Sequence, residues 1–412
     1  MGSQAFFQKK SSLLAQGFRH ARGRNTYADA ALLHDLVTIE FVDEIGHQTP
    51  ISNGYHGSMP ECKRRIIWLD YCKTIAIALL ILWHYPSVWS DGDYELLRTT
   101  RYISTFLMPF FFIASGMLHK DESSFMQAMR KCISRLLLPY LAFGLINLVI
   151  YCIQFPSIDI CISACVQILT GFNCPRCLMP HIVPVRMEIG PLWFVYSLIC
   201  IKLCLSCLHF IKQWSPPLGL AFYILLPLAC VVIICYHEVI RTVIGMRIAS
   251  SSIGVLFYMF GQYCAPYIKA LMDSPRKVVI AYLIPTLVVA AFSSRYCIGW
   301  GGTEYMSINA CNMGRSVIAF FICGISGAIS LVMACRMFPQ VQSSVIKIYS
   351  NGTLFILGVH WGLYQAIRQI LPLGAGLGNA IAYTLLMMML FYPLLRFAYA
   401  YCPILLGFRK QN

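Results

Sequence analysis

The chain has 412 residues, of which 58% are hydrophobic and only 12% are charged. Soluble domains carry about 25% charged residues, so this composition excludes a soluble globular protein, which would lack the polar surface to cover its core. The formal net charge of +15 could suggest nucleic-acid binding, but no basic run is interleaved with aromatic residues on a hydrophilic domain. Basic cytoplasmic loops of a membrane protein explain the charge better.

Residues 1–60 precede the apolar part of the chain and show no sustained periodicity. They lack the continuous apolar core of a signal peptide, and Phe6 stands where myristoylation after Gly2 would need Ser or Thr. We expect residues 1–60 to be disordered, or to be a mis-annotated extension, because Met59 begins a natural membrane-protein N-terminus. Residues 61–412 are expected to form one transmembrane domain.

The rest of the chain contains a series of apolar segments. A helix needs about 20 predominantly apolar residues to cross the hydrocarbon core of a membrane. Such stretches lie at 68–86, 102–118, 136–154, 191–211, 218–236, 248–264, 278–294, 316–335, 351–370 and 379–398. The sequence therefore predicts an all-α fold, a polytopic membrane helix bundle of about ten transmembrane helices.

The basic residues predict the orientation of this bundle. If the chain starts inside, the inner segments from residue 61 onward hold sixteen Lys and Arg residues, whereas the outer segments hold nine, all of them Arg. This bias favours both termini in the cytoplasm. We expect a multi-pass protein of the cell's inner (plasma) membrane.

Two ionisable residues lie in the first predicted span, Lys73 and His84, with ten uncharged residues between them. Eleven residues of α-helix rotate by about 1100°, some 20° more than three full turns, and rise by about 16 Å. Both residues therefore lie on one face, where Asp70 can pair with Lys73. Ionisable groups at membrane depth are costly and usually face a bundle interior or a hydrated cavity. The structural alternative is an anchor, with Lys73 reaching to the interface and His84 capping the helix.

The segment RIIWLDYCKTIAIALLILWHY (65–85) resembles the first transmembrane helix of the acyltransferase family 3 membrane proteins, where ten residues separate an Arg or Lys from a His. Four more segments are similar to family motifs in the same order: FLMPFFFIASGML (106–118), RLLLPY (135–140), GPLWFVYSL (190–198) and NGTLFILGVH (351–360). The resemblance covers about residues 64–400. It implies an acyltransferase family 3 transmembrane domain and is strongest to the fucose 4-O-acetylase-like sugar O-acetyltransferases.

Two positions depart from the family pattern. Leu107 stands where many members of that subgroup carry a His, so the second helix supplies no histidine. Cys132 stands where many relatives carry an Arg, three residues before the position that matches Arg135. Arg130 and Lys131 are close by but at a different spacing, so a paired grip on coenzyme phosphates would need a different geometry here.

The resemblance implies transfer of an acyl group, usually acetyl, from acetyl-CoA to a carbohydrate hydroxyl. Such a hydroxyl is not ionised at neutral pH, so a base must take its proton as it attacks the thioester. Histidine suits this task because its ordinary pKa is about 6.5. We expect His84 to be the general base, with a transient acyl-His84 as the alternative. Lys73 would hold developing negative charge or a CoA phosphate, and Asp70 would orient Lys73.

Other residues are expected to bind the two substrates. Arg130, Lys131 and Arg135 supply positive charge at the cytoplasmic mouth, where an anionic coenzyme would arrive. Trp193 and His360 are candidates for contacts with the sugar or the coenzyme, and Asn309 for contacts with acceptor hydroxyls from an outer loop. The alternatives are an interface anchor for Trp193, a packed histidine for His360 and a solvated loop residue for Asn309.

Most of the nineteen cysteines lie in the predicted spans and act as small apolar residues. Cys174, Cys177 and His181 lie together in the outer 155–190 loop. They lack a fourth zinc ligand, and a disulfide would suit an oxidising compartment. We expect no metal and no permanently bound cofactor, since acetyl-CoA is a co-substrate. Expected partners are acetyl-CoA, a carbohydrate acceptor and membrane lipids, and no nucleic acid; the oligomeric state is not predicted.

A transporter or flippase of a glycan or small molecule is the alternative function for a chain of this composition. Transporters often show two related halves and broken helices at matching positions, and neither is visible in this sequence. A non-catalytic sensor or scaffold has no evident use for the Lys–His pair. The sequence therefore favours a membrane-bound O-acyltransferase.

Overall fold

The structure is a computed structural model. It describes residues 65–86, 93–154, 156–170, 192–236, 246–299, 304, 306–371 and 374–407. The predictions for residues 1–60, and for Cys174, Cys177 and His181, concern residues outside these ranges and stay predictions.

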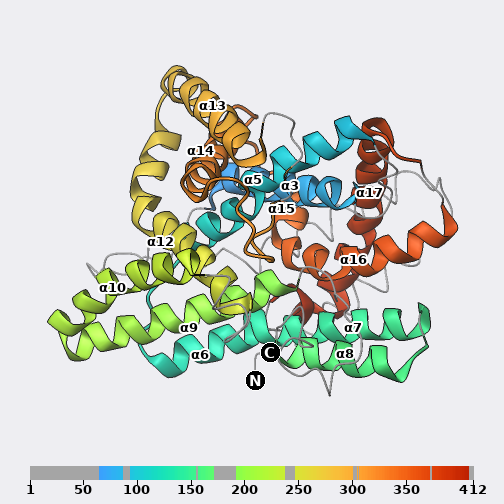
Figure 1. Ribbon diagram of the computed structural model, residues 1–412, viewed down its shortest axis with the longest axis horizontal. Helices are drawn as coiled ribbons and strands as arrows, with labels where there is room; N and C mark the ends of the chain where they lie inside the picture. Colours follow the sequence, from blue (N-terminus) through green and yellow to red (C-terminus); the bar gives the residue numbers. More distant parts are fainter. Residues whose placement is uncertain are drawn as a thin grey trace, which may run out of the picture. The chain divides into compact units, whose positions relative to one another are not determined.

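Helices make up nearly all of the described chain (Figure 1). In order they are α3 (Ile67–His84), α5 (Tyr94–Met117), α6 (Phe125–Cys132), the π-helical turn η1 (Ile133–Leu137), α7 (Leu138–Gln154), α8 (Ile158–Thr170), α9 (Trp193–Trp214), α10 (Pro216–Cys235), α12 (Met246–Asp273), α13 (Arg276–Ile298), α14 (Val317–Arg336), α15 (Ser344–Asn351), α16 (Thr353–Ile370), α17 (Leu377–Tyr401) and the 3-10 turn η3 (Pro403–Leu406). The β-structure of the described ranges is one isolated antiparallel bridge, between Ser307 and Asn312.

The predicted all-α membrane bundle is confirmed. Each of the ten predicted spans overlaps one of these helices. Seven helices of the described part are long and apolar enough to cross a membrane: Ile67–His84, Phe125–Ile153, Trp193–Trp214, Pro216–Cys235, Arg276–Ile298, Val317–Arg336 and Leu377–Tyr401. The helices α5 and α12 are as long but carry more polar residues, so ten crossings remain a prediction.

The centre of the bundle is α5, which packs against α3, α12 and α14 (Figure 1). A Cβ atom added at Gly116 of α5 would lie 2.0 Å from the backbone oxygen of Tyr258 on α12. One added at Gly261 of α12 would lie 2.1 Å from the backbone oxygen of Ile113 on α5. Glycine at these positions lets two backbones touch, as small residues often do between membrane helices.

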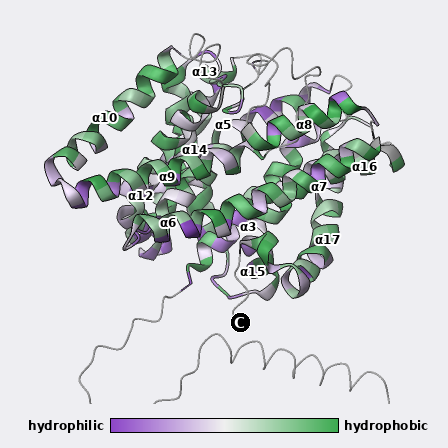
Figure 2. Cartoon of the chain, turned by 90° about the horizontal axis from the view of Figure 1, so that it is seen from below, coloured by the Kyte–Doolittle hydropathy of each residue, from purple (hydrophilic) through white to green (hydrophobic). Residues whose placement is uncertain are grey.

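The helices α10 and α13 expose large apolar side chains. Leu220 and Ile224 of α10 are 58% and 57% exposed, and Ile284 and Phe292 of α13 are 60% and 63% exposed. Figure 2 shows α10 as hydrophobic over most of its length. Soluble monomers rarely expose continuous apolar faces of this kind, so these surfaces fit the lipid tails of a bilayer.

Candidate active site

The helix α3 carries both Lys73 and His84 without interruption. Between them, Ala76, Ile77 and Leu80 lie at helical spacing on the same face, and all three are completely buried. The face that Lys73 and His84 share is therefore turned into the bundle rather than toward lipid. If Lys73 and His84 only anchored the helix at the membrane surface, their side chains would not need to face the interior of the bundle.

A second histidine lies beside His84. The ring centroids of His84 on α3 and His360 on α16 are 5.1 Å apart, and the indole of Trp361 meets the His84 ring edge-on at 5.3 Å. The Nε2 atoms of both histidines are buried and have no hydrogen-bond partner among the described residues. The structure thus brings together one residue predicted to be the base and one predicted to bind substrate.

The hydrogen bonds of His360 define its protonation. Its Nδ1 lies 2.9 Å from the carbonyl oxygen of Ile356 and 3.1 Å from that of Leu357. Carbonyl oxygens only accept hydrogen bonds, so Nδ1 carries the proton, and Nε2 of the neutral ring is an acceptor. Leaving a buried acceptor unsatisfied costs about 1–3 kcal/mol. An unsatisfied acceptor of this kind suits a ligand that donates a hydrogen bond, and the unpartnered Nε2 of His84 lies on the neighbouring ring.

Neighbouring bonds hold the two rings in place. The hydroxyl of Tyr364, one turn after His360, donates to the carbonyl oxygen of Ile81 at 2.5 Å and joins α16 to α3. The indole Nε1 of Trp361 donates to the hydroxyl of Tyr151 on α7 at 2.7 Å. The site is therefore built on three helices, which position reacting groups more precisely than loops do.

Asp70 has different partners from those expected. Its carboxylate accepts hydrogen bonds from Nε and Nη2 of Arg65, at 2.5 and 3.1 Å, and from Oγ of Ser350 on α15, at 2.6 Å. Arg65 also donates to Oδ1 of Asn351 at 3.0 Å. The expected ion pair between Asp70 and Lys73 is not formed, because a guanidinium that binds a carboxylate through two nitrogens is the stronger partner.

Lys73 is consequently a half-buried cation on the interior face of α3. It lies within electrostatic reach of Asp70 and Arg65, but it makes no ion pair within the described part of the chain. A positive charge of this kind inside a membrane bundle usually serves a ligand or a reaction. Its role in holding negative charge stays a prediction.

The predicted coenzyme-binding residues lie on α6 and η1. Arg130 and Arg135 are exposed, whereas Lys131 forms an ion pair with Glu122 and is less available to a ligand. Arg135 lies in the π-helical turn, a feature that often occurs at functional sites. Lys202 of α9 lies within electrostatic reach of Arg135 and Glu122 and adds a positive charge. This group of cations can receive an anion, although its spacing is not that of the family motif.

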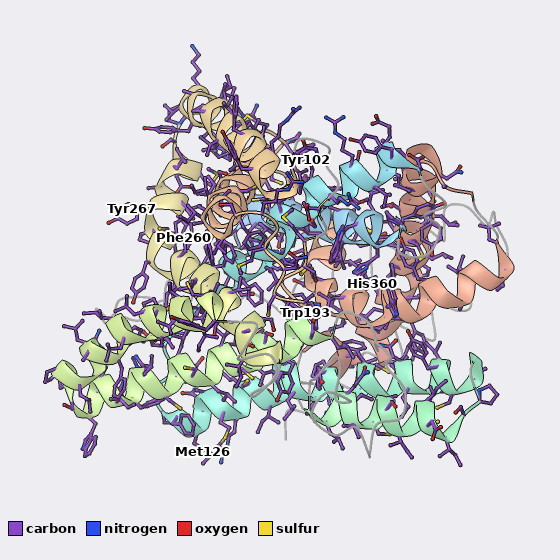
Figure 3. All side chains as sticks on the ribbon, in the orientation of Figure 1. Tyr102, Met126, Trp193, Phe260, Tyr267 and His360 are labelled. Carbon is purple, nitrogen blue, oxygen red and sulfur yellow. The ribbon has the colours of Figure 1, made fainter. Side chains whose placement is uncertain are left out.

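Trp193 and Asn309 lie elsewhere. Figure 3 marks Trp193 at the start of α9 and His360 on α16. Trp193 is buried, and its ring packs against Phe112 and Phe194. Asn309 lies in the turn between Ser307 and Asn312, in the segment that joins α13 to α14. No ring contact or hydrogen bond described for either residue reaches the two histidines, so their substrate contacts stay predictions.

Sequence reasoning missed several residues around the site. Arg65, Ser350, Trp361 and Tyr364 all make the contacts described above. The last two could have been found, because they follow His360 at one and four residues in the segment HWGLY. The bond from Ser350 to Asp70 and the bond from Arg65 to Asn351 could not, since Ser350 and Asn351 are remote in sequence from α3.

A second polar network lies beyond the C-terminal end of α5. Nδ1 of His119 is 2.7 Å from the hydroxyl of Tyr258, and its Nε2 is 3.2 Å from Oδ1 of Asp121. The same oxygen is 3.3 Å from Nδ1 of His209 on α9. Burial lowers the pKa of His119 below its usual value, so its ring is neutral at neutral pH. The network joins α9 and α12 to the segment after α5.

A family model described as an acyltransferase domain, that of acyltransferase family 3, matches residues 66–398. No curated protein and no solved structure matches the chain. The matched region covers most of the chain and includes α3, with Lys73 and His84, and α16, with His360. The chain therefore belongs to acyltransferase family 3.

Proposed function

We propose that this membrane acyltransferase moves an acetyl group, or another short acyl group, from acyl-CoA to a hydroxyl of a cell-surface carbohydrate or of its lipid-linked precursor. The observation that carries the proposal is the pair of neighbouring rings of His84 and His360, each with a buried Nε2 atom that has no described protein partner. The fucose 4-O-acetylase-like enzymes that the motifs resemble support a sugar as the acceptor.

In the proposed reaction, an acceptor hydroxyl donates its hydrogen bond to Nε2 of His84. As the hydroxyl oxygen attacks the thioester carbonyl carbon, His84 takes the proton. The carbon–sulfur bond then breaks, and the CoA thiolate receives the proton from the His84 imidazolium. The products are the sugar ester and CoA. Nε2 of His360 accepts a hydrogen bond from a second hydroxyl of the acceptor and orients it.

The donor is proposed to arrive at the end of the bundle that carries Arg130 and Arg135. Lys73 lies on the same helix face as His84, about 16 Å nearer to the start of α3. Its charge can bind a coenzyme phosphate or the oxyanion that forms at the thioester. We place both chain termini in the cytoplasm of a cell bounded by an inner membrane, so that acetyl-CoA reaches this end directly.

The test uses purified protein in lipid nanodiscs with acetyl-CoA radiolabelled in the acetyl group. Free CoA is followed by thiol titration, and labelled ester is separated after incubation with a panel of monosaccharides and isolated cell-envelope glycans. The proposal expects acceptor-dependent CoA release and labelled glycan. Folded protein that binds acetyl-CoA but yields no labelled ester with any of these acceptors would contradict it.

The alternative route through an acyl-His84 is distinguished in the same experiment. If acyl-His84 forms, one equivalent of CoA is released in the absence of acceptor, and the protein becomes labelled. If the hydroxyl attacks the thioester directly, no CoA is released without acceptor and the protein stays unlabelled.

A further inference from the structure

The helices α7 and α8 are consecutive in the chain and pack against each other as an antiparallel hairpin. At its open end, the hydroxyl of Tyr140 donates to the carbonyl oxygen of Ile168 at 2.8 Å. At its closed end, Cys152 lies in the last turn of α7, and Cys161 lies in the first turn of α8. Their Sγ atoms are 2.7 Å apart. The covalent S–S distance is about 2.05 Å, so a small side-chain rotation brings the two sulfurs to bonding distance.

We infer that Cys152 and Cys161 form a disulfide that closes the α7–α8 hairpin on the outer side of the membrane. The two thiols lose their protons and together give up two electrons, and one bond forms between the two Sγ atoms. The oxidant is a disulfide of a thiol–disulfide oxidoreductase in the oxidising compartment, which is reduced to two thiols in the exchange.

The position of Cys152 on α7 indicates which side of the membrane the two cysteines face. Residues Phe125–Ile153 run as one helical stretch of 29 residues, which is about 43 Å long and longer than the hydrocarbon core of about 30 Å. Arg130, Lys131 and Arg135 lie at its beginning, and Cys152 lies at its end. Basic residues mark the cytoplasmic side, so the hairpin turn faces the opposite, oxidising side. This step depends on the proposed orientation but not on the proposed reaction.

A second cysteine pair in the bundle provides a contrast. Cys72 of α3 and Cys335 of α14 are also buried neighbours that interact electrostatically. Cys72 lies in the part of α3 that follows Arg65, and Cys335 lies beside Arg336 at the end of α14, both on the expected cytoplasmic side. Thiols are kept reduced there, so this pair is expected to remain as two thiols.

The bond lies next to the candidate active site. Tyr151, the residue before Cys152, accepts the hydrogen bond of Trp361, and Trp361 contacts the ring of His84. A link between Cys152 and Cys161 fixes the last turn of α7 and therefore the position of the Tyr151 hydroxyl. The disulfide supports the geometry around His84 from the outer side.

The test counts reducible thiols in the full chain taken from cells. Cells expressing the protein are quenched in acid, denatured and blocked with N-ethylmaleimide; the protein is then reduced and labelled with a polyethylene glycol maleimide. Cys152→Ser and Cys161→Ser should each lose two labels relative to the wild type. Cys72→Ser and Cys165→Ser, the latter at an exposed cysteine of α8, should lose none.

Mass spectrometry of the wild-type protein, digested without reduction, should find the peptides of Cys152 and Cys161 linked, and it needs no variant to fold. Both thiols found blocked by N-ethylmaleimide would overturn the inference. A link from Cys152 to Cys165 would overturn it as well, and Cys165→Ser would then lose two labels. Because the labels report thiols and not acyl transfer, the result is independent of whether the proposed reaction is correct.

Discussion

The imidazole of His360 lies 5.1 Å from that of His84, and the Nε2 atom of each ring is buried without a described hydrogen-bond partner. One ring comes from the first described helix, α3, and the other from α16, near the end of the chain. Each side chain alone could be a packed histidine. Together they form a buried polar site in which Nε2 of His360 can accept a hydrogen bond from a hydroxyl group.

The role of His360 can be tested by removing its acceptor atom while keeping its volume. His360→Phe should lower turnover by about fivefold to 160-fold, because a lost hydrogen bond of about 1–3 kcal/mol corresponds to that range. His360→Gln, which retains an amide acceptor, should lose less. Steady-state kinetics with varied acceptor and thermal unfolding of each variant are the measurements. A fall in the unfolding temperature of His360→Phe with unchanged turnover would assign His360 to packing alone.

The charge of Lys73, which forms no ion pair with a described residue, leads to a second prediction. Lys73→Met keeps the length and apolar stem of the side chain but removes the charge. It should weaken acetyl-CoA binding or lower turnover by about tenfold or more, the effect of one charge-assisted hydrogen bond. Lys73→Arg should restore part of the loss. Calorimetric binding of acetyl-CoA and kinetics separate the two effects, and normal values for Lys73→Met in both would exclude Lys73 from the site.

The partners of Asp70 predict a role in stability. Asp70→Ala removes the acceptor of Arg65 and Ser350 in a partly buried position and should cost about 1–3 kcal/mol. Arg65→Ala should cost a similar amount, and the double variant should cost little more than either single one. Thermal or denaturant unfolding in nanodiscs measures the three values. Fully additive costs would show that Arg65 and Asp70 do not act as a pair.

The close contact of α5 with α12 predicts a strong effect of a single methyl group. Gly116→Ala would place its Cβ 2.0 Å from the backbone oxygen of Tyr258, a contact that requires the two helices to separate. The variant should lose folded yield or several degrees of unfolding temperature. Gly378→Ala is the matched control, because a Cβ there meets no atom within 4 Å. Equal stability of the two variants would contradict the described packing.

Much of the fold could be predicted from the sequence. Each of the ten apolar segments that the sequence predicts as a span overlaps a described helix. This agreement is expected, because a lipid environment requires long apolar helices. The shared face of Lys73 and His84 also followed from helix geometry. The partner of Asp70 did not, since Arg65 and Lys73 both lie within reach of it in sequence and only the tertiary position of α15 favours Arg65. The contact between His84 and His360 depends on how α3 packs against α16, which spacing along one helix cannot give.

The central claim is that His84 removes the proton of the acceptor hydroxyl, and its most direct test is the turnover of His84→Ala measured with radiolabelled acetyl-CoA and acceptor in nanodiscs. We predict a loss of about 10² to 10⁴ in turnover, with a normal unfolding temperature and undiminished acetyl-CoA binding, because the imidazole acts on the acceptor and not on the coenzyme. Folded His84→Ala protein that turns over at a near-normal rate would contradict the account.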